Sequence, residues 1–203
     1  SLMTHGHSHG AGQRHVRPLS IAFALVVVFM FVEVVGGVLT GSLALVSDAG
    51  HMATDALGLG MALAAILVAK KASSSSDRTY GLYRLEILAA LANAVLLLAI
   101  ATYVIYEAIQ RIEDPPEVLT GPMLVVAVIG LLVNIAAWQL LREGAEESIN
   151  VKGAYYEVIA DLAGSIGVIA AALIMITTGW PYADPLFAGL IGLFILPRAW
   201  TLG

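Results

Sequence analysis

Long apolar runs separated by short polar breaks dominate the hydrophobic pattern of this chain. Five runs are clear, at residues 19–39, 43–69, 87–106, 123–141 and 155–178. A sixth run, at residues 186–196, is bounded by prolines and reaches spanning length only when it is extended to residues 182–202. About 20 apolar residues in a helix cross the hydrocarbon core of a bilayer. The pattern therefore predicts six transmembrane helices.

The predicted fold class is an all-α, polytopic membrane protein. An isolated apolar segment in lipid must satisfy its own backbone hydrogen bonds, and these runs lack the alternation of a membrane β-barrel. Composition agrees, because only 12% of the residues are charged, against about 25% in soluble domains. The absence of cysteine excludes disulfides and thiolate metal ligands. The net charge of −5 offers no basic excess for a nucleic-acid partner.

The basic residues predict the orientation of the six spans. If the amino terminus is inside, nine of the ten Lys and Arg residues lie on the inner side and only Arg111 faces outward. The positive-inside rule then places both termini in the cytoplasm and the protein in the inner (plasma) membrane. Residues 1–18 are expected to form a cytoplasmic tail, and residues 19–203 the transmembrane domain. The tail either collects metal or binds it only adventitiously, through four histidines: His5, His7, His9 and His15.

Two pairs of polar residues inside the apolar runs carry the candidate chemistry. His51 and Asp55 are four residues apart in the second run, and Glu157 and Asp161 are four apart in the fifth. This spacing stacks both members of a pair on one helix face. One imidazole and three carboxylates would complete a tetrahedral site for a divalent ion such as Zn²⁺, Mn²⁺ or Fe²⁺. Because such ligands must lose protons to bind, the site is expected to exchange metal for protons.

The polar residues inside the apolar runs also admit other interpretations. Buried acids can act as hydrogen-bonded contacts between helices, although intramembrane acids are functional by default. A metal-dependent hydrolase is disfavoured because the chain has no His-Glu-x-x-His motif. A membrane metal sensor that binds without transporting stays open. Asn134 and Ser165 are expected to form interhelical hydrogen bonds, while Glu33 and Asp48 either relay protons or hydrogen-bond helix ends.

Several motifs resemble those of the cation diffusion facilitator family. They are the stretches 47–58 (SDAGHMATDALG), 83–91 (YRLEILAAL), 106–108 (YEA), 150–154 (NVKGA) and 161–165 (DLAGS). The resemblance covers all six predicted helices. It implies a homodimeric exporter of Zn²⁺, or of a similar ion such as Cd²⁺ or Co²⁺, driven by inward proton flow. The implied alternating-access site is formed by His51, Asp55, Asp161 and the residue at position 157.

Two departures from the family pattern have consequences. Zinc-transporting members usually carry His or Asp where this chain has Glu157, so one Zn²⁺ among three carboxylates would leave a net negative charge. We therefore expect Glu157 either to hold a proton in the metal-bound state or to make the site less selective for zinc. The family also carries a cytoplasmic domain after the sixth helix. Because this sequence stops at Gly203, the domain is absent from it, either because this member lacks the domain or because the sequence is truncated.

Overall fold

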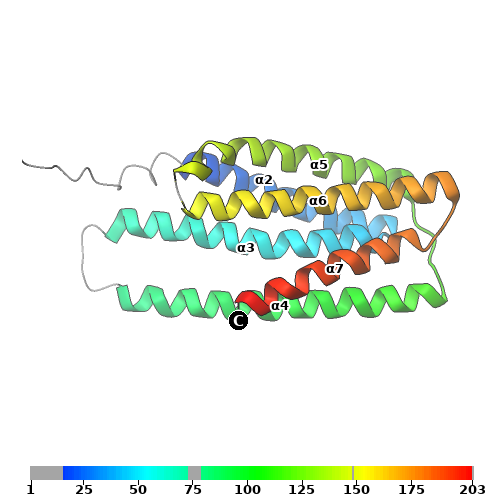
Figure 1. Cartoon of the computed structure of the whole chain (residues 1–203), viewed down its shortest axis with the longest axis horizontal. Coiled ribbons are helices and arrows are strands. Elements are labelled where there is room, and N and C mark those ends of the chain that lie inside the picture. Colours follow the sequence, from blue (N-terminus) through cyan, green and yellow to red (C-terminus); the bar gives the residue numbers. More distant parts are fainter. Residues whose placement is uncertain (1–15, 73–78, 148, 203) are drawn as a thin grey trace, which may run out of the picture.

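The computed structural model describes residues 16–72, 79–147 and 149–202, which are helical apart from short connections. The all-α prediction is confirmed, and the described residues contain no strand. The predicted amino-terminal tail, with its four histidines, lies almost wholly outside the described residues. The helices, shown in Figure 1, are α2 (Val16–Thr40), α3 (Leu43–Ala72), α4 (Thr79–Glu113), α5 (Thr120–Arg142), η3 (Gly144–Glu146), α6 (Ile149–Thr178) and α7 (Ala183–Leu202).

The helices extend beyond the apolar runs that predicted them. The third run, 87–106, becomes the longer helix α4, because backbone hydrogen bonding continues where the side chains turn polar. The weakest prediction, the sixth helix, is confirmed with bounds close to the extended range, since α7 covers Ala183–Leu202. Pro185 falls in its first turn, where a missing backbone N–H costs nothing.

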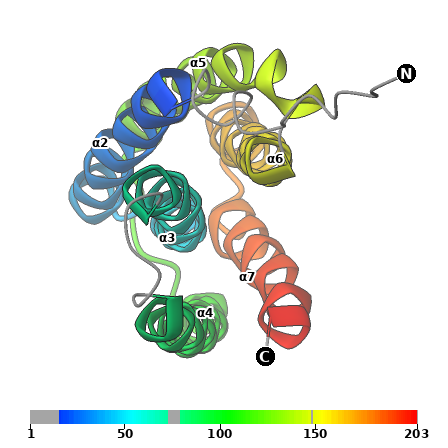
Figure 2. The same cartoon turned by 90° about the vertical axis from the view of Figure 1, so that its left-hand side faces the viewer.

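The six long helices fall into two groups. Helices α2, α3, α5 and α6 lie together, and α4 packs along α7 beside them, as the end-on view in Figure 2 shows. Helix α3 contacts α2, α4, α6 and α7 and therefore connects the groups. The α2–α3, α4–α5 and α6–α7 connections meet at one end of the bundle, on the right in Figure 1. We call this the outer end, following the predicted orientation.

The distribution of side chains suits lipid as the surrounding solvent. Among the described residues, four segments are long and apolar enough to cross a membrane: Val16–Thr40, Ile87–Glu113, Thr120–Arg142 and Val151–Thr178. Helix α3 falls outside that group, and the apolar part of α7, Ala183–Phe194, is shorter. Large apolar side chains such as Leu39 and Phe194 are exposed, whereas thirteen polar or charged residues are buried. This inverts the usual arrangement in water, where charged side chains are almost never fully buried unless they are paired.

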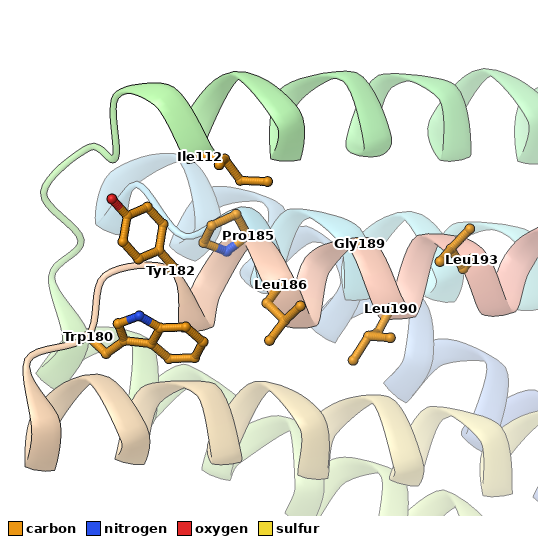
Figure 3. A pocket seen from close by; sticks show the side chains of 8 residues that line it. All are labelled: Ile112, Trp180, Tyr182, Pro185, Leu186, Gly189, Leu190 and Leu193. Carbon is orange, nitrogen blue, oxygen red and sulfur yellow. The ribbon is translucent and has the colours of Figure 1, made fainter.

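An apolar pocket of about 320 Å³ lies near the outer end, between α4, α7 and the α6–α7 connection. Ile112 lines it from α4, Leu186 and Leu190 from α7, and Trp180 and Tyr182 from the connection (Figure 3). These side chains provide no carboxylate or imidazole ligand for a metal. The candidate chemistry therefore lies elsewhere, in the interior between α3 and α6.

Candidate metal centre

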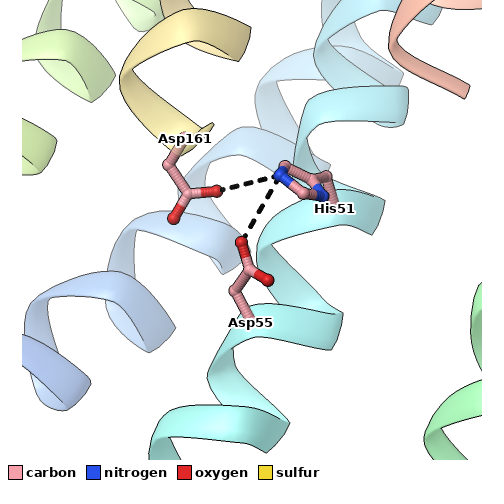
Figure 4. Close-up of side chains that lie close together, drawn as sticks. All are labelled: His51, Asp55 and Asp161. Atoms are coloured by element: carbon pink, nitrogen blue, oxygen red, sulfur yellow. Dashed lines mark ion pairs between the residues drawn. The ribbon is translucent and has the colours of Figure 1, made fainter. Parts of the chain in front are cut away.

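Three of the four predicted ligands meet between α3 and α6. His51 and Asp55 lie one turn apart on α3, and Asp161 faces them from α6 (Figure 4). One potential ligand atom from each residue lies within 4.8 Å of the other two, and all three residues are buried. The i, i+4 spacing therefore puts His51 and Asp55 on one face, as expected, and the packing of α6 against α3 supplies the third ligand.

Two of the three distances between ligand atoms in this cluster match those of a tetrahedral metal site, and all three atoms lie within 4.8 Å of one another. His51 Nε2 lies 3.4 Å from Asp55 Oδ2 and 3.6 Å from Asp161 Oδ1. In a tetrahedron with metal–ligand bonds of about 2.1 Å, neighbouring ligand atoms are about 3.4 Å apart. A divalent ion could therefore bind with little movement of these side chains.

The surroundings of Asp161 favour a cation. Its side chain is fully buried, and neither carboxylate oxygen accepts a hydrogen bond from a described residue. A buried carboxylate without donors is strongly unfavourable, so it requires either a proton or a cation. Asp161 therefore either holds a proton or is available to a cation.

Glu157, the fourth predicted ligand, lies outside the three-residue cluster. It is half-buried on α6, and its carboxylate packs against Gly58 of α3. Gly58 lies about one turn after Asp55 along that helix. A Cβ atom added to Gly58 would come within 2.8 Å of Glu157 Oε1. The missing side chain at position 58 thus leaves room for this carboxylate between the helices. Whether Glu157 completes the coordination stays a prediction.

Two further buried acids lie near the cluster, and sequence reasoning did not pair them. Glu33 of α2 and Asp48 of α3 are fully buried, and their carboxyl groups lie within hydrogen-bonding reach of each other. No described donor satisfies their oxygens, and two ionised carboxylates have only acceptors, so a bond between them needs a proton. A Cβ atom on Gly164 of α6 would collide with Asp48. Each of α3 and α6 thus has a glycine facing an acid of the other helix.

One expected contact between helices is confirmed. Asn134 of α5 donates a hydrogen bond from Nδ2 to Ser165 Oγ of α6, at 3.1 Å, and both residues are buried. This bond links α6 to α5 on the side of α6 that carries Asp161. The bond helps to fix the rotation of α6 about its own axis, with Glu157 and Asp161 directed toward α3.

Comparisons with known proteins find matches over nearly the whole chain. A family model described as the cation efflux transmembrane domain matches residues 19–203. The chain is 52% identical over 197 residues to the metal cation efflux system protein CzcD of Cupriavidus metallidurans, an alignment covering 97% of this chain and 62% of that protein. It is 45% identical over 205 residues to the zinc transporter ZitB of Escherichia coli, covering 98% of this chain and 65% of that protein.

A further relative is named a cadmium, cobalt and zinc/H(+)-K(+) antiporter, from Bacillus velezensis. The identity is 46% over 196 residues, covering 96% of this chain and 62% of that protein. The chain thus spans less than two thirds of the length of each of these three relatives.

Proposed function

Since this chain belongs to the cation efflux family, we propose that it exports divalent transition-metal cations, chiefly Zn²⁺, in exchange for protons. The observation that carries the proposal is the buried cluster of His51, Asp55 and Asp161, whose potential ligand atoms lie within 4.8 Å of one another. The names of the relatives support an efflux function and extend the substrate range to Cd²⁺ and Co²⁺. The mixed nitrogen and oxygen donors also suit Mn²⁺ and Fe²⁺.

The exchange needs no covalent chemistry. Metal binds when the imidazole and the carboxylates have lost their protons, and protons return when the metal leaves. An inward-facing packing exposes the cluster to the cytoplasm and an outward-facing packing exposes it to the other side. Protons that enter from the outside then displace the metal outward and carry the cycle forward.

The remaining parts of the proposal concern the whole protein. We place it in the inner (plasma) membrane with both termini in the cytoplasm, because the basic residues lie almost all on one side. We also propose a homodimer, in line with the family resemblance. Cross-linking in native membranes, followed by gel electrophoresis, tests the dimer without requiring transport.

Reconstitution into proteoliposomes tests the transport function. The vesicles are made acidic inside, contain a zinc indicator and a pH indicator, and receive Zn²⁺ from outside. We expect Zn²⁺ uptake coupled to a rise in internal pH, and neither signal when the gradient is absent. Asp161→Asn should abolish both signals, because the amide cannot replace the anionic ligand.

The matched control is Asp114→Asn, which changes an exposed acid outside the cluster. Asp114→Asn should transport like the wild type. Saturable Zn²⁺ binding without uptake by the wild type would replace the transport proposal with that of a membrane metal sensor. Uptake that is unchanged in Asp161→Asn would show that the cluster is not the transport site.

A further inference from the structure

Another buried acid, Asp184, is surrounded by hydrogen-bond donors at the outer end. Its carboxylate accepts hydrogen bonds from Ser42 Oγ at 2.6 Å, Leu43 N at 2.7 Å and Ala44 N at 3.1 Å. Ser42 Oγ in turn accepts a bond from Leu45 N at 3.2 Å. The first backbone N–H groups of a helix have no partner inside the helix. Asp184 of α7, together with Ser42, therefore caps the amino end of α3.

Arg111 connects α4 to the same carboxylate. Its Nη1 atom donates a 2.6 Å hydrogen bond to Gly41 O and lies 3.6 Å from Asp184 Oδ2, while Nε contacts Glu107. Gly41 has a φ of +73°, which glycine adopts without strain and which ends α2 just before the cap. This arrangement also gives a role to Arg111, the single basic residue predicted on the outer side.

Contact between α3 and α7 continues past the cap toward the metal centre. Ser47 Oγ donates a 3.1 Å hydrogen bond to Ala188 O, one turn beyond the cap. His51 follows one turn further along α3, about 12 Å from the helix start at 1.5 Å per residue. The helix that carries two of the three clustered ligands is thus held by α7 at two successive levels.

We propose that Asp184 is a positioning residue, and that its carboxylate joins the outer ends of α3, α7 and α4 so that they move as one unit during transport. This inference rests on the transport function proposed above. Separating these ends would leave the buried Asp184 carboxylate and the first backbone N–H groups of α3 without their partners. Arg111 would keep only Gly41 O and Glu107. The change of packing therefore pivots about this joint, and the helices separate elsewhere.

Loss of the Asp184 carboxylate should lower the rate of transport more than the affinity for metal. Asp184 is not a ligand, and residues several turns apart couple only weakly in their energetics, so the Kd for Zn²⁺ should change by no more than about twofold in Asp184→Ala. The maximal transport rate should fall at least about tenfold, because the outer end of α3 no longer follows α7 and α4 through the conformational step.

Graded variants separate this role from a general loss of folding. Asp184→Asn keeps an acceptor for one backbone N–H but loses the charge facing Arg111, so its transport rate should lie between those of Asp184→Ala and the wild type. Amide exchange at residues 43–45 should be at least about tenfold faster in Asp184→Ala. It should be unchanged in the control, Asp114→Asn.

A cross-link tests directly whether the outer ends move together. The chain has no cysteine, so Ser47→Cys with Ala188→Cys creates the only thiol pair. Because both positions are buried and in contact, a small oxidising reagent that forms a disulfide directly should join α3 to α7 in proteoliposomes and leave at least half of the transport rate. The two single-cysteine variants, treated with the same reagent, are the controls.

The outcomes distinguish this inference from the proposed function. If the wild type transports but the cross-link stops it, α3 and α7 do not move as one unit and the inference is overturned. It is also overturned if Asp184→Ala leaves amide exchange at residues 43–45 and turnover unchanged, or if the loss is entirely in Kd. If the wild type does not transport at all, the proposed function fails, and the transport role of Asp184 is rejected with it while amide exchange still reports on the cap.

Discussion

Asp161 and Asp184 are both fully buried inside the helix bundle, yet their carboxylates have opposite surroundings. Asp184 accepts three hydrogen bonds from the start of α3 and faces Arg111. Neither oxygen of Asp161 accepts a hydrogen bond from a described residue, and its neighbours in the cluster are His51 and Asp55. Burial alone therefore does not identify a functional acid. The supply of donors separates an acid that stabilises the fold from one that is ready to bind an ion.

The same contrast appears within α3, between its amino end and its middle. Its amino end is capped by Asp184 of α7 and by Ser42, which directly precedes α3. Its middle carries acids that face other acids. The groups at the amino end of α3 thus have hydrogen-bond partners, whereas the acids in its middle lack donors. This difference suits a helix that stays anchored at one end while its centre responds to a bound ion. The predictions below test this difference.

The largest effect is expected for Asp161→Ala. Ion binding to the folded state raises its stability, by about 2.7 kcal/mol at a metal concentration one hundred times the Kd. Removing Asp161 should abolish this stabilisation, so Tm in detergent should no longer rise on addition of Zn²⁺. Without metal the variant should be no less stable than the wild type, because it loses an unsatisfied buried carboxylate. A Tm that still rises with Zn²⁺ as in the wild type would contradict the assignment.

Asp184→Ala should show the reverse pattern. Loss of a helix cap costs up to about 2 kcal/mol, and here Arg111 also loses one of its three partners. We expect a lower Tm without metal and a normal rise in Tm with Zn²⁺, measured in the same assay. The comparison fails if Asp184→Ala is as stable as the wild type or if it loses the response to Zn²⁺.

The pH dependence of Zn²⁺ binding sharpens the contrast between the two acids. Each proton displaced by the metal should raise the Kd about tenfold per unit fall in pH, below the pH at which the ligands are fully deprotonated. Affinity is thus expected to be high at alkaline pH and to fall as the pH falls, as measured by indicator competition. Asp184→Asn should keep the wild-type slope, since its carboxylate takes no part in binding. A flat profile for the wild type would count against proton exchange at the cluster.

Glu157→His addresses the ligand that lies outside the cluster. Replacing the carboxylate by a neutral imidazole should reduce the number of protons released on Zn²⁺ binding and favour Zn²⁺ over Mn²⁺ by a few-fold, because imidazole suits zinc better. Competition among Zn²⁺, Cd²⁺, Mn²⁺, Fe²⁺ and Co²⁺ at several pH values measures both effects. Identical pH profiles and an identical metal ranking would remove Glu157 from the site.

The smallest effect is expected for Asn134→Ala. Its hydrogen bond to Ser165 joins two neutral side chains, and such bonds within membranes average about 0.6 kcal/mol. We expect a small fall in Tm and an unchanged Kd for Zn²⁺. Ser165→Ala is the matched variant, and the double variant should lose little more than either single one.

The sequence by itself determined the helices and most of the candidate ligands. Apolar runs long enough to cross a bilayer must form helices in lipid, so hydropathy alone predicted all six. The i, i+4 spacing likewise determined that His51 and Asp55 share a face of α3, because the helical repeat depends only on local geometry.

The tertiary structure decided which acids are satisfied. Asp184 is 142 residues away from Ser42 in the chain, and no local pattern predicts that a carboxylate of α7 caps α3. Helix packing also brings Glu33 close to Asp48. It likewise places Glu157 against Gly58, outside the three-residue cluster. Hydropathy and periodicity act within a segment, whereas the neighbours of a buried carboxylate come from other helices, and those neighbours determine whether it anchors the fold or binds an ion.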